Sequence, residues 1–271
     1  MGIDRYAVIG HHIGYSRSPR IHSMFAQQCG QALDYSLIDV APAEFLAAAR
    51  NFLDGGGRGL NVTVPHKQAA LALAAERSAR AQRAGVLNTL AVRADGVFGD
   101  NTDGAGLVRD LTVNMKIELH GARILLLGAG GAARGILAPL LAAQPATLVI
   151  CNRSAGRAQQ LASEFAGLGP VSAGTAAGES FDLILNATSA TLQSELPAMP
   201  AHGVGSQTVC YDLAYRESAT AFVQWAQGQG AARAVMGLGM LVEQAAESFL
   251  LWRGLRPDTA PVLAALAAAA N

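Results

Sequence analysis

The chain has 271 residues, and its 20 Lys and Arg balance its 20 Asp and Glu, so the formal net charge is zero. A neutral chain lacks the positive field that gathers nucleic acid or anionic membrane, so we expect neither as a partner, and any anion site must be local. With 51% hydrophobic and 15% charged residues, the composition excludes a disordered chain and is typical of one large or two modest globular domains.

The cysteines and apolar stretches predict a cytoplasmic protein. Cys29, Cys151 and Cys210 are widely spaced and odd in number, unlike a disulfide framework or a paired-cysteine metal site, so we expect no metal. The N-terminus lacks the basic-then-apolar order of a signal peptide. Residues 124–143 are the longest apolar stretch, but Arg134, several glycines and a proline make it too short for a membrane span. Whether the chain forms a homodimer stays open.

The first hundred residues alternate between strand and helix patterns. A β-branched run at 5–10 predicts a buried strand. Ser18 then offers an N-cap with Pro19 at the first helical position, and apolar residues at helical spacing predict a helix that ends at Gly30. The elements expected next are a strand at 35–40, a helix at 43–52, a strand at 59–64, a helix at 67–84 and a hairpin from 88–92 and 96–98. This alternation predicts a parallel or mixed α/β sheet.

A second α/β series follows the polar segment 99–104, which is the best candidate for a domain boundary. The elements expected are strands at 123–127, 147–151, 181–186 and 208–213 and helices at 131–142, 155–165 and 219–229. These strands are almost wholly apolar, as expected for a parallel sheet buried on both faces. After Met240 we expect two helical pieces, separated by Gly254 and Pro257.

A glycine-rich turn between the strand at 123–127 and the next helix predicts a dinucleotide site. It fits the GxGxxG/A pattern, with its residues being Gly128, Ala129, Gly130, Gly131, Ala132 and Ala133. In that pattern the first glycine makes the tight turn, the second lets the backbone approach a pyrophosphate, and a small third residue packs the helix on the strand. The alternative is that the glycines only make a tight strand-to-helix turn.

The end of the next strand favours NADP over NAD. An NAD site places a carboxylate there for the ribose hydroxyls, whereas this chain has Asn152, Arg153 and Ser154, with Arg157 nearby. Guanidinium groups suit a 2′-phosphate. The alternative reading is a pair of solvated surface arginines.

Polar residues in the first half mark the ends of predicted strands, where the ligand crevice of an α/β sheet lies. They are Ser16, Ser18, Asn61, Thr63, Lys67, Asn88 and Asp103. Their hydroxyl and amide groups suit a small molecule with several hydroxyls, and Lys67 is the only cation among them. Asn61 and Thr63 alternate along a strand and so face one side together. Structural alternatives remain: Ser18 and Asp103 are good helix caps, the latter for a helix starting at Gly104.

Six motifs in chain order resemble the shikimate dehydrogenase family. Residues 15–19 are similar to its SxSP motif, 61–67 to NVTVPxK, 85–89 to AGAVNT, 99–104 to GDNTDG, 128–133 with 152–154 to GAGGA followed by NR(T/S), and 237–244 to GxGMLVxQ. Together they span nearly the whole chain. The resemblance implies reversible NADPH-dependent reduction of 3-dehydroshikimate to shikimate in chorismate and aromatic amino-acid biosynthesis.

The same resemblance implies a role for each matching residue. Lys67 and Asp103 would form the catalytic pair. Substrate would be bound by Ser16, Ser18, Asn61, Thr63, Lys67, Asn88, Asp103, Tyr215 and Gln244. NADP would be bound by the residues of the 128–133 turn, the 152–154 segment and Arg157, together with Thr188, Leu213 and Gly237. Read from the residues alone, Gln244 sits in an apolar helix and would be taken for a core residue.

The chain departs from the family pattern at four positions. His12 replaces a proline and Tyr15 a histidine in the first loop, His66 replaces the frequent Phe before Lys67, and Met236 stands where Asp is frequent. None of these removes a proposed catalytic group. His11 and His12 invite a metal interpretation, but adjacent residues on a strand point to opposite faces, so we expect no metal there.

The resulting prediction is a two-domain α/β enzyme. A substrate-binding catalytic domain with a mixed sheet would comprise 1–103 and 238–271, its last helices returning to bring Gln244 to the substrate. A Rossmann-type NADP-binding domain would comprise 104–237. The alternatives are a quinate/shikimate or aminoshikimate dehydrogenase of the same superfamily, and a catalytically silent NADP-binding regulator.

Overall fold

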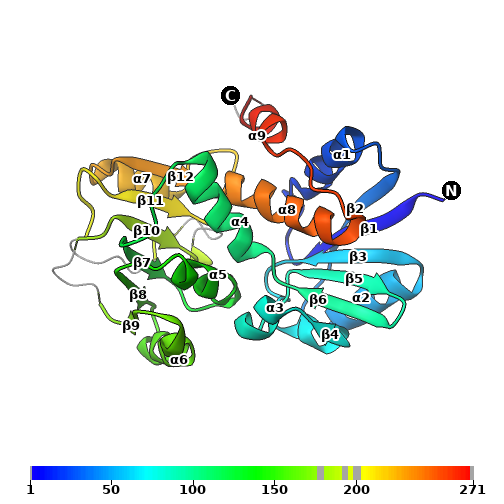
Figure 1. Ribbon diagram of the computed structural model, residues 1–271, viewed down its shortest axis with the longest axis horizontal. Coiled ribbons are helices and arrows are strands. Elements are labelled where there is room, and N and C mark those ends of the chain that lie inside the picture. The colour runs from blue at the N-terminus through cyan, green and yellow to red at the C-terminus, as the bar shows by residue number, and fades with distance from the viewer. Residues whose placement is uncertain (1, 176–179, 191–194, 198–202, 269–271) are drawn as a thin grey trace. The chain divides into compact units, whose positions relative to one another are not determined.

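The computed structural model of the chain describes residues 2–175, 180–190, 195–197 and 203–268 (Figure 1). Its contacts divide the chain into two compact units. The chain passes from the first unit to the second between Gly106 and Leu107 and returns between Met240 and Leu241. The sequence-based boundaries, after residues 103 and 237, each lie three residues earlier.

The first unit is built on a mixed sheet. Its described strands are β1 (Asp4–Gly10), β2 (Leu33–Asp39), β3 (Gly57–Val62), β4 (Glu76–Arg77), β5 (Thr89–Arg93) and β6 (Gly96–Asp100), in the order β2-β1-β3-β5-β6-β4. Strand β1 pairs in parallel with β2 and β3, whereas β5 runs antiparallel to β3 and β6. The carboxyl ends of β1 and β3 therefore lie at one edge of the sheet, where the loops after Gly10 and Val62 begin.

Helices of the first unit cover this sheet and supply its core. They are α1 (Ser18–Gln28), α2 (Phe45–Asp54), a 3₁₀ helix (Ala69–Leu73), α3 (Ala79–Ala84) and α9 (Ala260–Ala268). Ile9 and Leu60 of the sheet pack with Phe45 and Ala49 of α2, and all four are fully buried. Amphipathic α2 is thus held by its apolar face.

The single helix predicted over 67–84 is wrong, because β4 interrupts it. The amide of Ala75 donates to the carbonyl of Val97, which draws the backbone toward β6 and into the sheet. Ser78 then has extended backbone angles, and its side chain accepts a hydrogen bond from the Ala81 amide. Ser78 therefore acts as an N-cap and begins a new helix, α3.

The second unit is built on a parallel sheet. Its described strands are β7 (Arg123–Leu127), β8 (Thr147–Cys151), β9 (Val171–Ala173), β10 (Leu183–Asn186), β11 (Val209–Asp212) and β12 (Arg233–Met236), in the order β12-β11-β10-β7-β8-β9. Each neighbouring pair is parallel. The chain moves outward from β7 to β8 and β9, then returns to the other side of β7 with β10. This reversal of strand order marks a ligand crevice at the carboxyl ends of β7 and β10.

Two strands of this sheet, β9 and β12, were not predicted from the sequence. Both are short, and none of their residues is fully buried. Edge strands of this kind carry no continuous apolar run, and so the pattern that identifies a buried parallel strand is absent from them. The four predicted strands and three predicted helices of the second unit begin and end within two residues of their expected positions.

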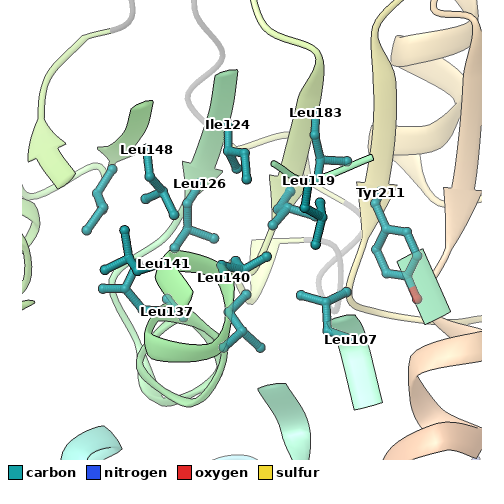
Figure 2. Packing of buried hydrophobic residues seen from close by; sticks show 14 of the residues in the cluster. Leu107, Leu119, Ile124, Leu126, Leu137, Leu140, Leu141, Leu148, Leu183 and Tyr211 are labelled. Carbon is teal, nitrogen blue, oxygen red and sulfur yellow. The ribbon is translucent and has the colours of Figure 1, made fainter. Parts of the chain in front are cut away.

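The main core of the second unit lies between its sheet and helix α5 (Gly131–Ala142). Helices α6 (Ala155–Phe165) and α7 (Ala221–Gly228) complete the cover of the sheet. Figure 2 shows Leu126 of β7 facing Leu137 and Leu140 of α5, and all three are fully buried. This packing fixes the start of α5 against the end of β7, which is where the glycine-rich turn lies.

Helices α4 (Asp103–Arg109) and α8 (Leu238–Arg253) carry the chain across the two unit boundaries. A π-helical turn at Asp110–Asn114 continues α4. Among the helices that the structure describes, none is both long and apolar enough to cross a bilayer.

Candidate active site

An ion pair between Lys67 and Asp103 forms the centre of the candidate site in the first unit. Lys67 Nζ donates to Asp103 Oδ2 at 2.5 Å, and the two side chains are only 13% and 5% exposed. Asp103 is the first residue of α4, and its amide donates to Asn101 Oδ1 at 3.1 Å. Because Asn101 serves the amide at the helix start, the carboxylate of Asp103 is directed to Lys67.

Asn88 and Gln244 complete the surroundings of this pair. Asn88 Nδ2 donates to Asp103 Oδ1 at 2.9 Å and lies 3.2 Å from Gln244 Oε1. Gln244 belongs to α8, far along the chain, and Gly106 lets α8 approach α4 closely. A Cβ at Gly106 would lie 2.6 Å from the backbone nitrogen of Gln244, so a larger residue at position 106 would push Gln244 away.

Asn61 joins this group both directly and through other side chains, since its Nδ2 lies 3.3 Å from the Asn88 backbone carbonyl and 3.2 Å from Thr89 Oγ1. Its amide is buried in β3, where Oδ1 accepts a 2.8 Å hydrogen bond from Tyr35 Oη and Nδ2 donates to Ser248 Oγ at 2.9 Å. Thr63 lies just beyond β3 and is half-buried. Its backbone N–H donates a hydrogen bond to the Ile9 carbonyl. The prediction placed both residues on one strand, but only Asn61 lies within it.

Ser16 and Ser18 lie on the loop that leads from β1 into α1. The N-cap position of α1 is Arg17, and Ser18 is the first helical residue, so the prediction of Ser18 as the cap is wrong. The Ser16 hydroxyl accepts a hydrogen bond from the Ser18 backbone amide at 3.3 Å, and so pairs a free N–H at the start of the helix as a capping side chain does. Both hydroxyls therefore stand at the start of α1, near the carboxyl end of β1.

The histidines of the first loop do not lie on a strand, and the prediction that they point to opposite faces is wrong. His12 has a φ of 56° in the turn after β1, and this left-handed residue brings the two rings to 3.8 Å between centroids. The His12 and Ile13 amides donate to the Asp39 carboxylate, which together with nearby histidine charge lowers the pKa of Asp39. The loop is thus tied to the end of β2.

His66, next to Lys67, fills the place of the more frequent phenylalanine. Its ring stacks on Phe45 at 4.4 Å, and Nε2 lies 3.2 Å from the Val40 carbonyl. Burial lowers the pKa of His66, against a smaller opposing effect of that carbonyl, so the ring is neutral at neutral pH. The imidazole therefore packs as the phenylalanine would and adds one hydrogen bond.

The glycine-rich turn of the second unit has the geometry of an anion site. Gly128 has a φ of 108°, and a Cβ there would lie 3.0 Å from the Ala187 backbone, so glycine is required for the turn. Gly130 is exposed at the N-cap of α5, and nothing lies within 4 Å of a Cβ built on it. Ala133 is fully buried in the packing of α5. The open space at Gly130 leaves the first amides of α5 accessible to a phosphate.

Two exposed arginines follow β8. Arg153 precedes α6 and Arg157 lies in its first turn, where a positive charge is opposed by the helix dipole. Neither guanidinium forms an ion pair within the described part of the chain. The Asn152 side chain bonds the Ser154 carbonyl and fixes this turn. Cations held in this position favour an anionic ligand, so the residues fit a nucleotide that carries a 2′-phosphate.

The ends of β10 and β11 are joined by a buried carboxylate. Asp212 is fully buried and accepts hydrogen bonds from Asn186 Nδ2, the Thr220 hydroxyl and the Ala214 amide. Asn186 Oδ1 in turn accepts from the amide and hydroxyl of Thr188. This network fixes the backbone around two predicted cofactor residues, Thr188 and Leu213.

Gly237 and Tyr215 complete the predicted set. A Cβ on Gly237 would lie 2.5 Å from the Leu213 carbonyl oxygen, so the backbone after β12 passes directly beside Leu213. Tyr215, after β11, belongs to the second unit, whereas the other predicted substrate residues belong to the first. Ala129, Gly131 and Ala132 lie on the turn and first residues of α5.

Four buried side chains of the site were not identified from the sequence. They are Tyr35, Thr89, Thr102 and Ser248. Thr89 and Thr102 lie inside the motifs already noted, next to Asn88 and Asp103. Their position in these motifs could therefore have identified them as residues of the site. Ser248 follows Gln244 by one helical turn and therefore shares its face of α8.

Three family models match successive parts of the chain. Residues 8–90 match the shikimate dehydrogenase substrate binding domain, residues 111–213 the shikimate / quinate 5-dehydrogenase model, and residues 237–267 the shikimate 5′-dehydrogenase C-terminal domain.

The chain is also similar to whole proteins. It is 56% identical over 269 residues to a shikimate dehydrogenase (NADP⁺) of Methylococcus capsulatus, covering 98% of this chain and 96% of the relative. It resembles the crystal structure of an Ael1 enzyme from Pseudomonas putida with 45% identity and a TM-score of 0.88, covering 97% and 98% of the two chains. The shikimate 5-dehydrogenase of Thermus thermophilus, in complex with NADP(H) and shikimate, is 32% identical with a TM-score of 0.85, covering 99% and 100%.

Proposed function

The chain belongs to the shikimate dehydrogenase family, and from this premise we propose that it catalyses the reversible NADPH-dependent reduction of 3-dehydroshikimate to shikimate. This reaction is a step of chorismate and aromatic amino-acid biosynthesis, and we place it in the cytoplasm. The observation that carries the proposal is the buried Lys67–Asp103 pair with Asn88 and Gln244 around it, in a chain whose second unit has a nucleotide-binding turn.

The substrate is assigned to the first unit. Ser16 and Ser18 would bind its carboxylate, since their hydroxyls lie at the start of α1 and a hydroxyl can donate to an anion. The ring hydroxyls would be bound by Asn61, Thr63, Asn88, Asp103 and Gln244. Tyr215, which belongs to the second unit, is the remaining residue assigned to the substrate.

The cofactor is assigned to the second unit. The pyrophosphate would lie on the start of α5, where Gly130 leaves room, and the 2′-phosphate between Arg153 and Arg157. Thr188, Leu213 and Gly237 would line the nicotinamide pocket. When bound, NADPH supplies the hydride.

Lys67 and Asp103 would supply the acid chemistry of the reaction. As the substrate carbonyl is reduced, negative charge develops on its oxygen, and the Lys67 ammonium would stabilise this charge and donate a proton to it. The carboxylate of Asp103 would hold the ammonium in place at 2.5 Å and accept a hydrogen bond from a substrate hydroxyl. Solvent would then return the proton to Lys67.

Quinate is the second candidate substrate, because one matching family model covers both shikimate and quinate 5-dehydrogenases. Ring substituents distinguish the two acids, and the paired serines with the arginine cluster favour shikimate and NADP.

Initial rates of cofactor reduction, measured by absorbance with shikimate or quinate and with NADP⁺ or NAD⁺, test the proposal. We expect the highest kcat/KM with shikimate and NADP⁺. Turnover confined to quinate would overturn the substrate assignment. No turnover with any pair would instead favour a silent NADP-binding protein, and NADP⁺ titration by intrinsic fluorescence would then measure its affinity.

A further inference from the structure

We propose that Ser248 and Thr89 are positioning residues: their hydroxyls link Asn61 to Asn88 in a directed chain of hydrogen bonds that fixes how Asn88 faces Asp103. The inference deepens the proposed function and rests on it, because it concerns how the Lys67–Asp103 pair is held. Neither hydroxyl contacts the pair itself.

The chain of hydrogen bonds begins at Tyr35. Its hydroxyl lies 2.8 Å from Asn61 Oδ1, so Asn61 presents its Nδ2 group to Ser248 Oγ, 2.9 Å away. Nδ2 carries only donors, and Ser248 therefore accepts this bond. The serine proton is left for another partner.

The direction of the next links follows from the backbone of Thr102. Its amide donates to Asn88 Oδ1 at 2.8 Å, and since an amide N–H is only a donor, this oxygen must face it. The Thr89 hydroxyl also donates to Asn88 Oδ1, at 2.9 Å. Thr89 has then used its only proton, so at the 2.8 Å contact with Ser248 it must accept and Ser248 must donate.

The chain ends at the candidate catalytic pair. With Oδ1 fixed, Asn88 Nδ2 faces Asp103 Oδ1 at 2.9 Å and Thr102 Oγ1 at 2.8 Å. A flipped Asn88 amide would place its oxygen against the Asp103 carboxylate and its NH₂ against the Thr102 amide. Two repulsive contacts would replace two hydrogen bonds.

Burial makes these links consequential. Ser248 and Thr89 are fully buried, and Asn88 and Asn61 are 2% and 7% exposed. A buried amide that loses a partner is costly, because water does not replace it. The Ser248 hydroxyl has two other oxygens within reach, the Gln244 carbonyl at 3.1 Å on its own helix and Thr102 Oγ1 at 3.3 Å. A bond to either would leave the shorter Thr89 contact without a proton.

The test compares variants that remove a hydroxyl with variants that keep it. Thr89→Val keeps the shape of the side chain but has no hydroxyl, Thr89→Ser keeps the hydroxyl but loses a methyl, and Ser248→Ala removes the other hydroxyl. Thr259→Val is the matched control, since it removes a buried hydroxyl that bonds Glu243 of the same helix α8. For each full-length variant, kcat and KM for shikimate are measured with the melting temperature.

We expect Ser248→Ala and Thr89→Val to lower kcat/KM about tenfold, mainly through kcat, as for one lost hydrogen bond in a buried network. Thr89→Ser is expected to restore kcat, and Thr259→Val to lower the melting temperature with parental kinetics. Parental kinetics in both hydroxyl-deficient variants would overturn the inference. So would equal damage from Thr89→Ser and Thr89→Val, which would show a packing role.

A readout besides activity separates this inference from the proposed function. In protein labelled with ¹⁵N-asparagine, the side-chain NH₂ protons of Asn61 and Asn88 are expected to exchange slowly in the parent and faster in Ser248→Ala. If the parent does not oxidise shikimate, the proposed function fails, while slowed exchange that Ser248→Ala abolishes still supports the hydrogen-bond chain. Unchanged exchange in that variant would contradict it.

Discussion

The Lys67–Asp103 pair is buried at a cost that the surrounding hydrogen bonds offset. A buried ion pair contributes little net stability, because removing two charges from water opposes their attraction. Asn88 supplies a further hydrogen bond to the carboxylate, so that each oxygen of Asp103 has a donor. Its place in the fold is therefore better explained by chemistry than by stability.

Replacement of Lys67 tests that chemistry. In Lys67→Ala the developing alkoxide would lose both its charge stabilisation and its proton donor, so we expect kcat to fall roughly 10²- to 10⁴-fold with a much smaller change in KM. Steady-state kinetics with shikimate and NADP⁺ measure both constants. Lys116→Ala removes an exposed lysine of the second unit and serves as the control. Near-normal turnover of Lys67→Ala would remove Lys67 from the mechanism.

His22 makes stability depend on pH. It is fully buried against Tyr35, neither ring nitrogen has a partner at hydrogen-bonding geometry, and burial lowers its pKa to about 3, which the neighbouring Asn61 opposes only in part. Between pH 6.5 and about 3 the unfolded chain binds a proton at His22 that the folded chain does not. The free energy of unfolding therefore falls as pH decreases through this window.

The measurement is urea unfolding of the parent and His22→Phe at pH 7 and pH 5. Phenylalanine fills the same stack without titrating, so its stability relative to the parent is expected to rise by up to about 1.4 kcal/mol per pH unit below 6.5. A difference between the two proteins that stays constant from pH 7 to pH 5 would show that His22 binds its proton equally in both states.

At the scale of the elements, the turn before α5 contains two glycines that are required for different reasons. Gly128 requires its positive φ and lies against the Ala187 backbone, whereas Gly130 has an ordinary φ of −91° and open space around it. We expect Gly128→Ala to lower the melting temperature by about 4 °C or more through backbone strain. Gly130→Ala should keep the parental melting temperature but weaken NADP⁺ binding, because its methyl occupies the space left for the pyrophosphate. Thermal melts and NADP⁺ titrations of both variants check this, and parental NADP⁺ affinity in Gly130→Ala would contradict it.

We expect the turn between β8 and α6 to set the cofactor preference. Removing a guanidinium that pairs with a phosphate is expected to raise the KM for NADP⁺ about tenfold in Arg153→Ala and Arg157→Ala, with little change for NAD⁺. Arg50→Ala, at an exposed position of α2, is the control for loss of one positive charge. An equal rise in both Michaelis constants would exclude specific recognition of the 2′-phosphate.

For the whole molecule, strand direction explains why, within each unit, polar residues scattered along the chain lie at the same end of the sheet. The carboxyl ends of β1 and β3 carry the first loop and the Asn61–Lys67 segment, and those of β7 and β10 carry the glycine-rich turn and Thr188. The sequence predicted both α/β series because apolar runs and glycine turns are local signals. Long-range pairing left no such signal, so the break of 67–84 by β4 was missed.

The candidate site, like the fold, was predicted from the sequence only in part. Lys67, Asp103, Asn88 and Gln244 were identified through motifs, and they do meet in the first unit. Ser248 was not identified, because a serine in an apolar helix resembles a neutral core position until the strands that pack against it are known. Neither predicted cap is at the N-cap position: Ser18 and Asp103 are the first residues of α1 and α4. Residue type does not distinguish Ser16 from Ser18 as a capping hydroxyl.

The most direct test of the central claim is the rate of 3-dehydroshikimate reduction by the full chain with NADPH and with NADH. The account predicts turnover with NADPH, with kcat/KM at least about tenfold higher than with NADH, because the exposed Arg153 and Arg157 would bind the additional phosphate. Reduction at equal efficiency with both cofactors, or no reduction of 3-dehydroshikimate by either, would contradict it.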